Sequence, residues 1–402
     1  MQDQMMTQKL TLDAAGSRHK VCFVINHSFA FRTLFRGLFP HLTGYGIDCD
    51  AVVGDAEYLG EGHAKLADVN IHVIPMTRAP SIVKDLISLV QMIWFFARNR
   101  YDVLHISTPK AAFLGAIAGR LTGHKNILFV VRIRIYEDMT GWRRSFFEWI
   151  DRCVCALSTS VAPISREMGE AMVRDGICSP EKLVYFGKGS SNGIDTKVYV
   201  KDAVTMERGT GLRKSLGIAP DTLVALFIGR LAQGKGVEHI PALIKRVESL
   251  KLPVHFVIAG PVDWREPTAP EVLEFIDSSP LVTRLEYQAD PAAAFAAADL
   301  LLFPSNREGF GNVALEAQAM ELAVSGFAIY GVREGVRHGE TGLLAAPGDT
   351  EGFVDNSIAL LTDKPMREKF GKRGAGWVRE NFSNEVVWTH LRATLFGMMA
   401  QK

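Results

Sequence analysis

The chain has 402 residues, of which 48% are hydrophobic and 22% are charged, and its formal net charge is +1. This composition excludes a disordered, collagenous or coiled-coil protein, and the balanced charge gives no reason to expect nucleic-acid binding. The length predicts two domains rather than one. The five cysteines have no zinc-ligating spacing, so we expect reduced thiols.

The amino-terminal residues 1–19 are polar and lack the apolar core of a secretory signal, which predicts a flexible tail and a cytoplasmic location. The most apolar stretch, residues 86–97, is shorter than the roughly 20 residues that a membrane-spanning helix needs. We therefore expect no crossing of a bilayer.

Residues 20–200 alternate short apolar runs with longer stretches of helical period. This alternation predicts an α/β domain in which a doubly wound parallel sheet lies between helices. The predicted strands are 21–25, 49–53, 71–74, 103–106, 127–131, 160–163 and 183–186. The predicted helices are 31–42, 83–98, 111–121, 143–157 and 165–175.

Residues 201–383 show the same alternation and predict a second doubly wound domain. The predicted strands are 224–228, 254–259, 284–287, 300–303 and 324–327. The predicted helices are 237–249, 270–278, 291–298, 312–320, 351–362 and 365–382.

The boundary between the domains is placed at residue 200, because the stretch 196–221 is charged, contains several glycines and lacks a sustained apolar run. An amphipathic helix within residues 384–402 is expected to pack back on the first domain. Because ligands of doubly wound domains bind at the carboxyl ends of the strands, we expect the active site in a cleft between the two domains.

The most specific motif is EGFGNVALE at 308–316, in which two carboxylates, Glu308 and Glu316, flank glycines directly before a predicted helix. A strand end, a glycine-rich turn and a helix start leave backbone N–H groups unpaired, and these suit a diphosphate. In the simpler alternative, Glu308 is an exposed loop charge and Glu316 a solvated helix residue. The turn consists of Gly309, Phe310, Gly311 and Asn312.

A second motif, GRLAQGKGV at 229–237, begins at Gly229 directly after an apolar run and ends at a predicted helix. Arg230 and Lys235 supply two cations, which would offset the charge of a nucleotide diphosphate as it leaves. The alternative is a surface loop with two solvated charges.

These two motifs together resemble those of the retaining glycosyltransferases of family 4, which have the GT-B fold, and the resemblance extends from Val21 to about Phe382. It implies that Glu308 contacts the transferred sugar and Glu316 the ribose hydroxyls, while Arg230 and Lys235 bind the diphosphate. The donor is then a nucleotide sugar, and we expect no cofactor and no metal ion.

Three further stretches, 101–111, 134–144 and 188–195, look like those of the capsule- and glycan-assembly subgroup. Members of this subgroup transfer a hexose or an N-acetylhexosamine, here expected from a UDP-sugar, to a saccharide on a polyprenyl diphosphate. Asn192 is expected near the nucleotide sugar. The candidates on the acceptor side are Ser107, Lys110, Arg132 and Arg134.

Two departures from the family pattern stand out. Where many members have His-x-His, this chain has His105-Ile-Ser107, so we interpret His105 as a packed core residue or a relocated polar contact. The segment 320–328 lacks the usual Gly-Leu-Pro turn and the Thr-Asp that often follows, which predicts altered geometry and reduced activity.

Aromatic residues interleaved with arginines, at 29–39 and at 142–149, predict a protein peripheral on the inner face of the cytoplasmic membrane. The simpler reading is that most of these aromatics belong to the core. The Asp-Cys-Asp sequence at 48–50 has the form of a metal-binding motif, but we interpret it as the polar start of a strand.

The expected mechanism needs no protein nucleophile. Arg230, Lys235 and the amides of 309–312 stabilise the leaving diphosphate, and the acceptor attacks on the face that the diphosphate leaves, which retains the anomeric configuration. Two alternatives stay open: a catalytically silent nucleotide-sugar-binding partner of a glycan-assembly complex, and a nucleotide-sugar epimerase on the same architecture.

Overall fold

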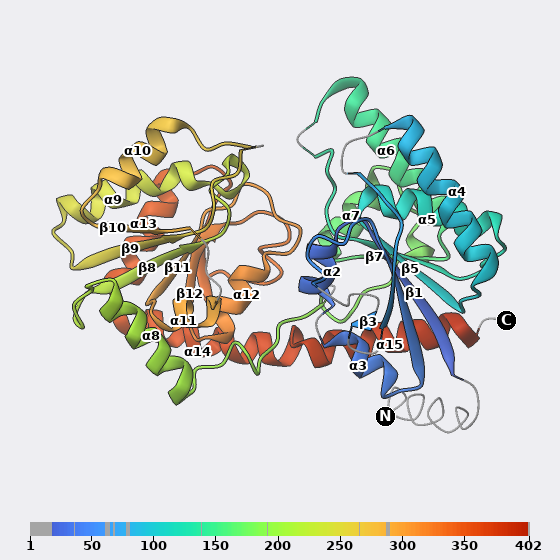
Figure 1. Cartoon of the computed structure of the whole chain (residues 1–402). Coiled ribbons are helices and arrows are strands. Elements are labelled where there is room, and N and C mark those ends of the chain that lie inside the picture. Colours follow the sequence, from blue (N-terminus) through green and yellow to red (C-terminus); the bar gives the residue numbers. More distant parts are fainter. Residues whose placement is uncertain are drawn as a thin grey trace. The chain divides into compact units, whose positions relative to one another are not determined.

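A computed structural model of the chain describes residues 18–35, 37–60, 65–66, 69–77, 81–137, 139–190, 192–264, 266–286 and 290–400. The chain divides into two compact units, residues 1–192 with 385–402, and residues 193–384 (Figure 1). The division falls between Asn192 and Gly193, before the expected boundary at residue 200. The predicted tail lies outside the described residues except for Arg18 and His19.

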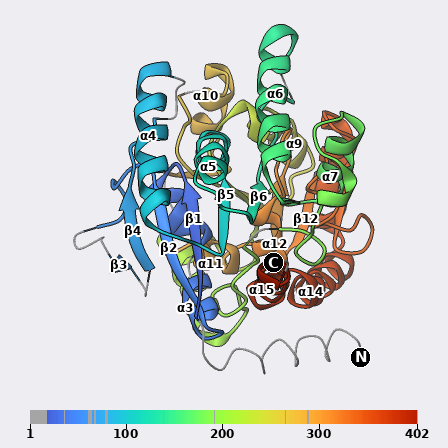
Figure 2. The same cartoon turned by 90° about the vertical axis from the view of Figure 1, so that its right-hand side faces the viewer.

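The first unit contains a sheet of order β3-β4-β2-β1-β5-β6-β7, which is parallel except for the β3–β4 pair. Its strands are β1 (His19–Ile25), β2 (Ile47–Val53), β3 (Lys65–Leu66), β4 (Val69–Val73), β5 (Val103–Ser107), β6 (Ile127–Val131) and β7 (Ser160–Pro163). Its helices are α2 (Ser28–Leu34), α3 (Leu38–Thr43), α4 (Ile82–Arg98), α5 (Pro109–Leu121), α6 (Gly141–Leu157), α7 (Arg166–Arg174) and the 3-10 helix η1 (Pro180–Lys182). Helices α4, α5 and α6 pack side by side (Figure 2).

The second unit contains a fully parallel sheet of order β10-β9-β8-β11-β12-β13. Its strands are β8 (Leu223–Ile228), β9 (Val254–Ala259), β10 (Val282–Leu285), β11 (Leu300–Phe303), β12 (Ala323–Phe327) and β13 (Gly342–Ala345). Its helices are α8 (Ala203–Ser215), α9 (Ile240–Ser249), α10 (Pro270–Ser278), α11 (Pro291–Ala296), α12 (Asn312–Ala319), α13 (Thr350–Thr362) and α14 (Lys364–Asn381), with 3-10 helices η2 (Gln233–Lys235) and η3 (Val237–His239).

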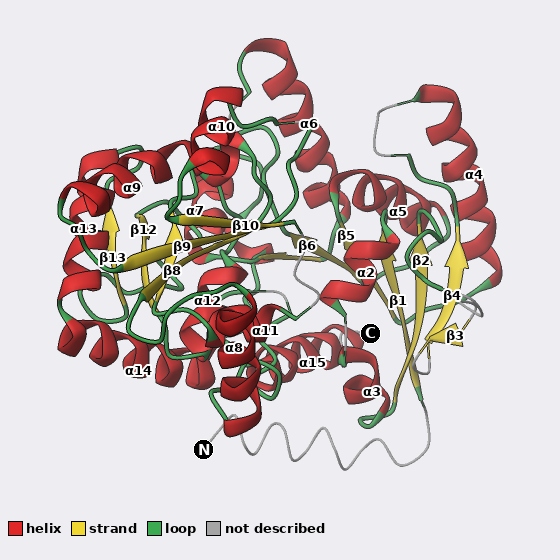
Figure 3. Cartoon of the chain, turned by 60° about the vertical axis from the view of Figure 1, so that its left-hand side comes forward, coloured by secondary structure: helices red, strands yellow, loops and turns green. Residues whose placement is uncertain are grey.

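Both faces of the second sheet are buried, as its uninterrupted apolar strands predict. Along β8, Ala225 and Phe227 pack into a core with α9 and α13, while Val224 and Leu226 pack into a second core with α11 and α12 (Figure 3). The strand period of two therefore supplies both cores from one strand. The prediction of two doubly wound α/β domains is confirmed.

The carboxyl-terminal helix α15 (Asn384–Ala400) belongs to the first unit from Glu385 onward. The Trp388 ring lies 5.3 Å from the ring of His41, and the Arg392 guanidinium lies 3.5 Å above the ring of Tyr45. These contacts hold the end of the chain against α3 and the turn that follows it.

Several predicted elements differ from the structure. The predicted helix 31–42 is two helices, α2 and α3, because Gly37 between them has a left-handed backbone with a φ of 80°. The predicted strand 183–186 is only an isolated bridge from Leu183 to Val161. The stretch 196–221, in which no element was predicted, contains α8. The predicted strand 284–287 starts earlier, at Val282, and its last residue lies outside the described part.

Helix α12 ends in a left-handed turn at Glu321, within the segment that lacks the expected Gly-Leu-Pro turn. The Glu321 N–H donates to the Gln318 carbonyl at 2.9 Å, and the Leu322 N–H donates to the Ala317 carbonyl at 2.9 Å, which is the Schellman arrangement. Glu321 has a φ of 60°, a conformation that is unfavourable for residues with a Cβ atom. Its carboxylate lies 3.4 Å from the Lys201 ammonium, and this partly exposed ion pair offsets only part of the strain.

Replacing this residue separates the backbone strain from the ion pair. We expect Glu321→Gly to be more stable than Glu321→Gln by about 1 kcal/mol, because both variants lose the ion pair and only glycine relieves the left-handed strain. Urea unfolding followed by circular dichroism measures the difference. Equal unfolding free energies of the two variants would show that the turn is unstrained.

Candidate active site

The two sequence motifs of the second unit meet at the centre of its sheet. Strands β8 and β11 are hydrogen-bonded neighbours, and the chain leaves them towards opposite edges, β8 to β9 and β11 to β12. Such a switch point opens a crevice at the carboxyl ends of the strands, where ligands of open α/β sheets bind. The loop after β8 (229–237) and the loop after β11 (304–311) both begin at this point.

Backbone contacts fix the two loops against each other. The N–H groups of Asn306 and Arg307 donate to the Gly234 carbonyl at 3.1 and 3.3 Å. Gly236 has a φ of 68°, and a Cβ atom at this position would lie 1.7 Å from the Pro304 carbonyl oxygen. Only glycine therefore permits this approach, which carries Lys235 to the second loop.

The loops also share an ion pair that was not predicted from the sequence. Lys235 Nζ lies 2.6 Å from Glu308 Oε1, and the Ser305 hydroxyl donates to the same oxygen at 2.8 Å. The side chains of Lys235 and Glu308 are 25% and 11% exposed, so the pair is largely shielded from water. A cation and a carboxylate predicted separately thus form one unit.

The second cation of the β8 loop, Arg230, forms an ion pair with Asp263. The Arg230 side chain is 56% exposed while that of Asp263 is 8% exposed, so the carboxylate anchors an accessible guanidinium. Sequence reasoning missed Asp263, although a polar residue closely following a buried strand, β9, is the signal that would have found it.

The start of α12 offers unpaired backbone donors. Gly311 is the N-cap, with a left-handed φ of 68°, and it has no side chain to cap the first amides. The Asn312 side-chain oxygen is buried without a hydrogen-bond partner among the described residues. The preceding Phe310 is 4% exposed and packs against Phe382, and the Gly309 carbonyl lies close to Gly331. This turn can therefore bind an anion through its backbone.

Glu316 lies on α12, about one turn beyond these amides, and is partly exposed. Desolvation raises the pKa of its carboxyl to about 7, and a hydrogen bond with Tyr199 opposes this rise. A carboxyl poised between its two protonation states near neutral pH is frequent at functional sites. Sequence reasoning missed Tyr199, since nothing in its local pattern connects it to a helix so distant in the chain.

At the end of β5, the two residues that stand where many family members have His-x-His are both buried. His105 is 1% exposed and its ring lies 4.5 Å from that of Phe23, so of the two interpretations it is the packed core residue. Burial, with a contribution from the Arg132 charge, lowers the pKa of His105 to about 3 and keeps it neutral. The Ser107 side chain is fully buried, and its hydroxyl has no hydrogen-bond partner among the described residues.

The next two candidates on the acceptor side are cations, Lys110 in an ion pair and Arg132 in a desolvated position. Lys110 Nζ lies 2.6 Å from Asp85 Oδ1, which joins the start of α5 to the start of α4. The Arg132 guanidinium lies 5.4 Å from the centre of the Phe35 ring, and desolvation lowers its pKa to about 9. Asn192, expected near the nucleotide, is the last residue of the first unit before the chain enters the second.

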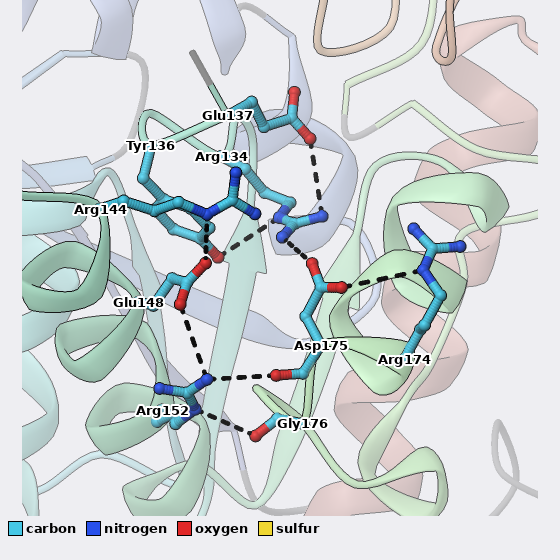
Figure 4. A network of polar contacts seen from close by, with 9 residues as sticks. All are labelled: Arg134, Tyr136, Glu137, Arg144, Glu148, Arg152, Arg174, Asp175 and Gly176. Carbon is cyan, nitrogen blue, oxygen red and sulfur yellow. Dashed lines mark hydrogen bonds and ion pairs between the residues drawn. The ribbon is translucent and has the colours of Figure 1, made fainter. Parts of the chain in front are cut away.

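Arg134 is 3% exposed and stands at the centre of a polar network (Figure 4). Its guanidinium donates to Asp175 and, at 3.3 Å, to the Tyr136 hydroxyl, and it lies 3.6 Å from the Glu137 carboxylate. The network ties the loop after β6 to the end of α7. With these contacts, Arg134 positions this loop from a buried place.

Among the described residues, no cluster of three or more His, Cys, Asp or Glu side chains has the arrangement of a metal site. The Asp48 carboxylate pairs with Arg18 at 2.6 Å, and Asp50 accepts hydrogen bonds from Tyr101 and Asn70, both at 2.8 Å. Both of these carboxylates of strand β2 thus have protein partners. In the same part of the chain, no helix combines the length and apolar character that crossing a membrane requires.

Comparison with known families agrees with this geometry. Residues 210–377 match the family of glycosyl transferases group 1, and residues 32–189 match the glycosyl transferase 4-like domain. These regions include both β8 and β11 loops in the second unit and most of the sheet of the first. The second unit therefore carries a group 1 glycosyltransferase domain, and the first unit carries a glycosyl transferase 4-like domain.

Several known proteins are similar over most of the chain. It is 27% identical to the capsular polysaccharide biosynthesis glycosyltransferase CapM of Staphylococcus aureus over 360 residues, 90% of this chain and 92% of that protein. It is 24% identical over 296 residues to the UDP-Gal:alpha-D-GlcNAc-diphosphoundecaprenol alpha-1,3-galactosyltransferase of Escherichia coli, 72% of this chain and 74% of that one. The structure of Anabaena HepE with UDP and glucose has a TM-score of 0.75 at 18% identity and covers 94% of this chain and 99% of its own. The predicted GT-B fold is therefore confirmed.

The raised pKa of Glu316 makes a prediction about pH. If its carboxylate accepts hydrogen bonds from ribose hydroxyls, ligand binding favours the ionised form, and affinity falls as the pH drops below about 7. We expect UDP-glucose, used as a probe, to bind roughly tenfold more weakly at about pH 6 than at about pH 8, as measured by titration calorimetry. Glu316→Gln is the control, and its affinity should not change with pH. A wild-type profile as flat as that of the variant would remove Glu316 from the binding site.

Proposed function

We propose that this glycosyltransferase transfers a hexose or an N-acetylhexosamine from a UDP-sugar to a saccharide on a polyprenyl diphosphate, with retention of the anomeric configuration. The observation that carries the donor assignment is the convergence of the β8 loop, with its two cations, and an uncapped helix start at the β8–β11 switch point. Backbone donors and cations directed to one point are complementary to a diphosphate. UDP bound to the structurally similar HepE supports the choice of nucleotide.

Without ligand, both cations are neutralised by carboxylates, Lys235 by Glu308 and Arg230 by Asp263. A diphosphate that approaches the loops competes with these carboxylates for the cations, and we propose that it releases Glu308 to accept hydrogen bonds from the sugar. The carboxylates hold the cations in place before binding, which reduces the cost of ordering two long side chains. Glu316 and Tyr199 then face the ribose from α12 and the segment before α8.

In the chemical step, the bond between the anomeric carbon and the phosphate oxygen breaks, and its electron pair stays on the diphosphate. Arg230, Lys235 and the amides of residues 309–312 stabilise the charge that develops there. An acceptor hydroxyl forms the new bond on the same face, and its proton passes to an oxygen of the departing phosphate. The donor loses one nucleoside diphosphate and the acceptor gains one sugar.

The names of two relatives support the proposed acceptor. The Escherichia coli relative is named for a sugar on diphosphoundecaprenol and the Staphylococcus aureus relative for capsular polysaccharide. We propose an acceptor of the same class, bound through the first unit, and a protein peripheral on the cytoplasmic membrane. Lys110 and Arg132, at the carboxyl ends of β5 and β6, supply cations for an anionic carrier.

A second candidate is a catalytically silent nucleotide-sugar-binding protein. It is favoured by the complete burial of Ser107 in place of a second histidine, which removes a polar contact from the end of β5. Transfer activity separates it from the enzyme.

The cations of the β8 loop provide the first test of the transferase. Arg230→Ala and Lys235→Ala should each lower kcat by about tenfold or more, because each removes charge stabilisation that is strongest in the transition state. Lys214→Ala, which removes an exposed cation of α8 in the same unit, is the matched control and should leave kcat unchanged. Full activity in both loop variants would exclude the proposed role of the loop.

The substrates themselves are tested with a panel of UDP- and GDP-sugars and a polyprenyl-diphosphate monosaccharide. We expect mass spectrometry to detect the acceptor extended by one sugar with one donor of the UDP series, and NMR of the product to show retained configuration. Nucleotide-sugar binding without extension of any acceptor would favour the silent protein. Interconversion of free UDP-sugars without an acceptor would favour an epimerase.

A further inference from the structure

Helix α4 presents an apolar face to solvent. Six of its large apolar side chains are between 53% and 89% exposed, namely Ile82, Val83, Leu86, Ile87, Val90 and Trp94. At roughly 100° per residue, these positions span an arc of about 140°, and the only other residues in that arc are Ile93 and Ala97. The buried residues of α4 lie on the opposite side of the helix and pack against the first unit. The outer face of the helix therefore consists of apolar side chains only. Those buried residues are Ser88, Met92, Phe95 and Phe96.

The same character continues on α5, which packs between α4 and α6 (Figure 2). Phe113, Ile117 and Leu121 follow one another every four residues along α5, on the side that is not fully buried, and Leu121 is 69% exposed. The first of them, Phe113, lies 6.4 Å from the Trp149 ring of α6. The line of apolar side chains on α5 thus connects with α6.

Helix α6 adds large aromatic side chains. Trp142, Phe146 and Trp149 fall within an arc of about 60° and are 75%, 45% and 53% exposed. The rings of Phe146 and Trp149 stack at 6.4 Å. We name the exposed apolar residues of α4, α5 and α6 together the three-helix face. A solvent-exposed set of this size is unusual for a protein that functions alone in water.

The charges around the three-helix face are those of a surface that attracts anions. Lys84 and Arg98 are exposed on α4, where the Arg98 guanidinium lies 3.8 Å from the Trp94 ring. The acid of this helix, Asp85, is already paired with Lys110 at 2.6 Å.

The charges of α6 are arranged in the same way. Glu148 pairs with Arg144 at 2.8 Å and with Arg152 at 3.7 Å, and Asp151 is buried. The Arg143 guanidinium lies 5.8 Å from the Trp142 ring. Tryptophan next to arginine is typical of the boundary between lipid headgroups and acyl chains.

We infer that the three-helix face docks on an anionic phospholipid bilayer. It extends over three helices packed side by side, consists of exposed apolar side chains, and places cations beside its tryptophans, where lipid phosphates lie. The inference rests on the proposed function, since a lipid-borne acceptor requires an enzyme at the membrane. It also relocates the membrane contact, because Phe31 and Phe39 in the predicted segment 29–39 belong to the core.

The test is binding to vesicles of phosphatidylglycerol and phosphatidylethanolamine by the full chain. Leu86→Glu/Val90→Glu places two charges in the middle of the exposed arc of α4, and we expect the partition coefficient to fall at least about tenfold. The matched control is Val204→Glu/Leu250→Glu, which changes two exposed apolar residues of the second unit and should bind like the wild type. Vesicles of phosphatidylcholine alone should bind the wild type more weakly.

Two results would overturn the inference. One is equal vesicle binding by Leu86→Glu/Val90→Glu and the wild type. The other is a wild type that does not bind vesicles and is a dimer in light scattering, while the variant is a monomer. That result would make the face an interface between two copies. Transfer to a short-chain, water-soluble acceptor should survive in the variant. If neither protein transfers sugar to any acceptor, the proposed function fails, and the vesicle measurement still decides the docking surface.

Discussion

The junction between the β8 and β11 loops is the constraint on which the site depends. The Lys235–Glu308 ion pair, the hydrogen bonds to the Gly234 carbonyl and the contact between Gly236 and Pro304 all join the same two loops. Neither loop has a regular structure longer than a single 3-10 turn, so each depends on the other for its conformation. A largely shielded ion pair adds little net stability, but it orients two side chains that would otherwise sample many rotamers.

Much of the fold could be predicted because its strands are short apolar runs with clear ends. Strands β6, β7, β9 and β11 have the predicted bounds, and the two motifs were expected at strand ends for the same reason. Helix α8 could not be predicted, because its glycines read locally as helix breakers. The structure gives one of them a role: a Cβ atom at Gly209 would lie 2.6 Å from the backbone of Ala296, so glycine allows α8 to pack on α11.

The two loops were expected to lie together, and they do, but the ion pair between them was not predicted. Lys235 and Glu308 were expected to act on different parts of a ligand, and their mutual contact depends on tertiary structure that links residues 73 positions apart. Arg134 was predicted to contact the acceptor. In the structure its guanidinium donates hydrogen bonds to Asp175 and Tyr136 within the protein. Phe31, Phe35 and Phe39 likewise suggested membrane contact from their pattern, but their side chains are buried in the core.

The second unit begins and ends at one place. The Ile194 N–H donates to the Phe382 carbonyl at 2.8 Å, and the Asn384 N–H donates to the Ile194 carbonyl at 2.9 Å, so the two crossings of the chain are joined by a short ladder. A segment whose entry and exit are held together in this way can be cut out, or inserted into another polypeptide, without opening its core. Residues 193–384 thus form a unit whose two ends are joined to each other by backbone hydrogen bonds.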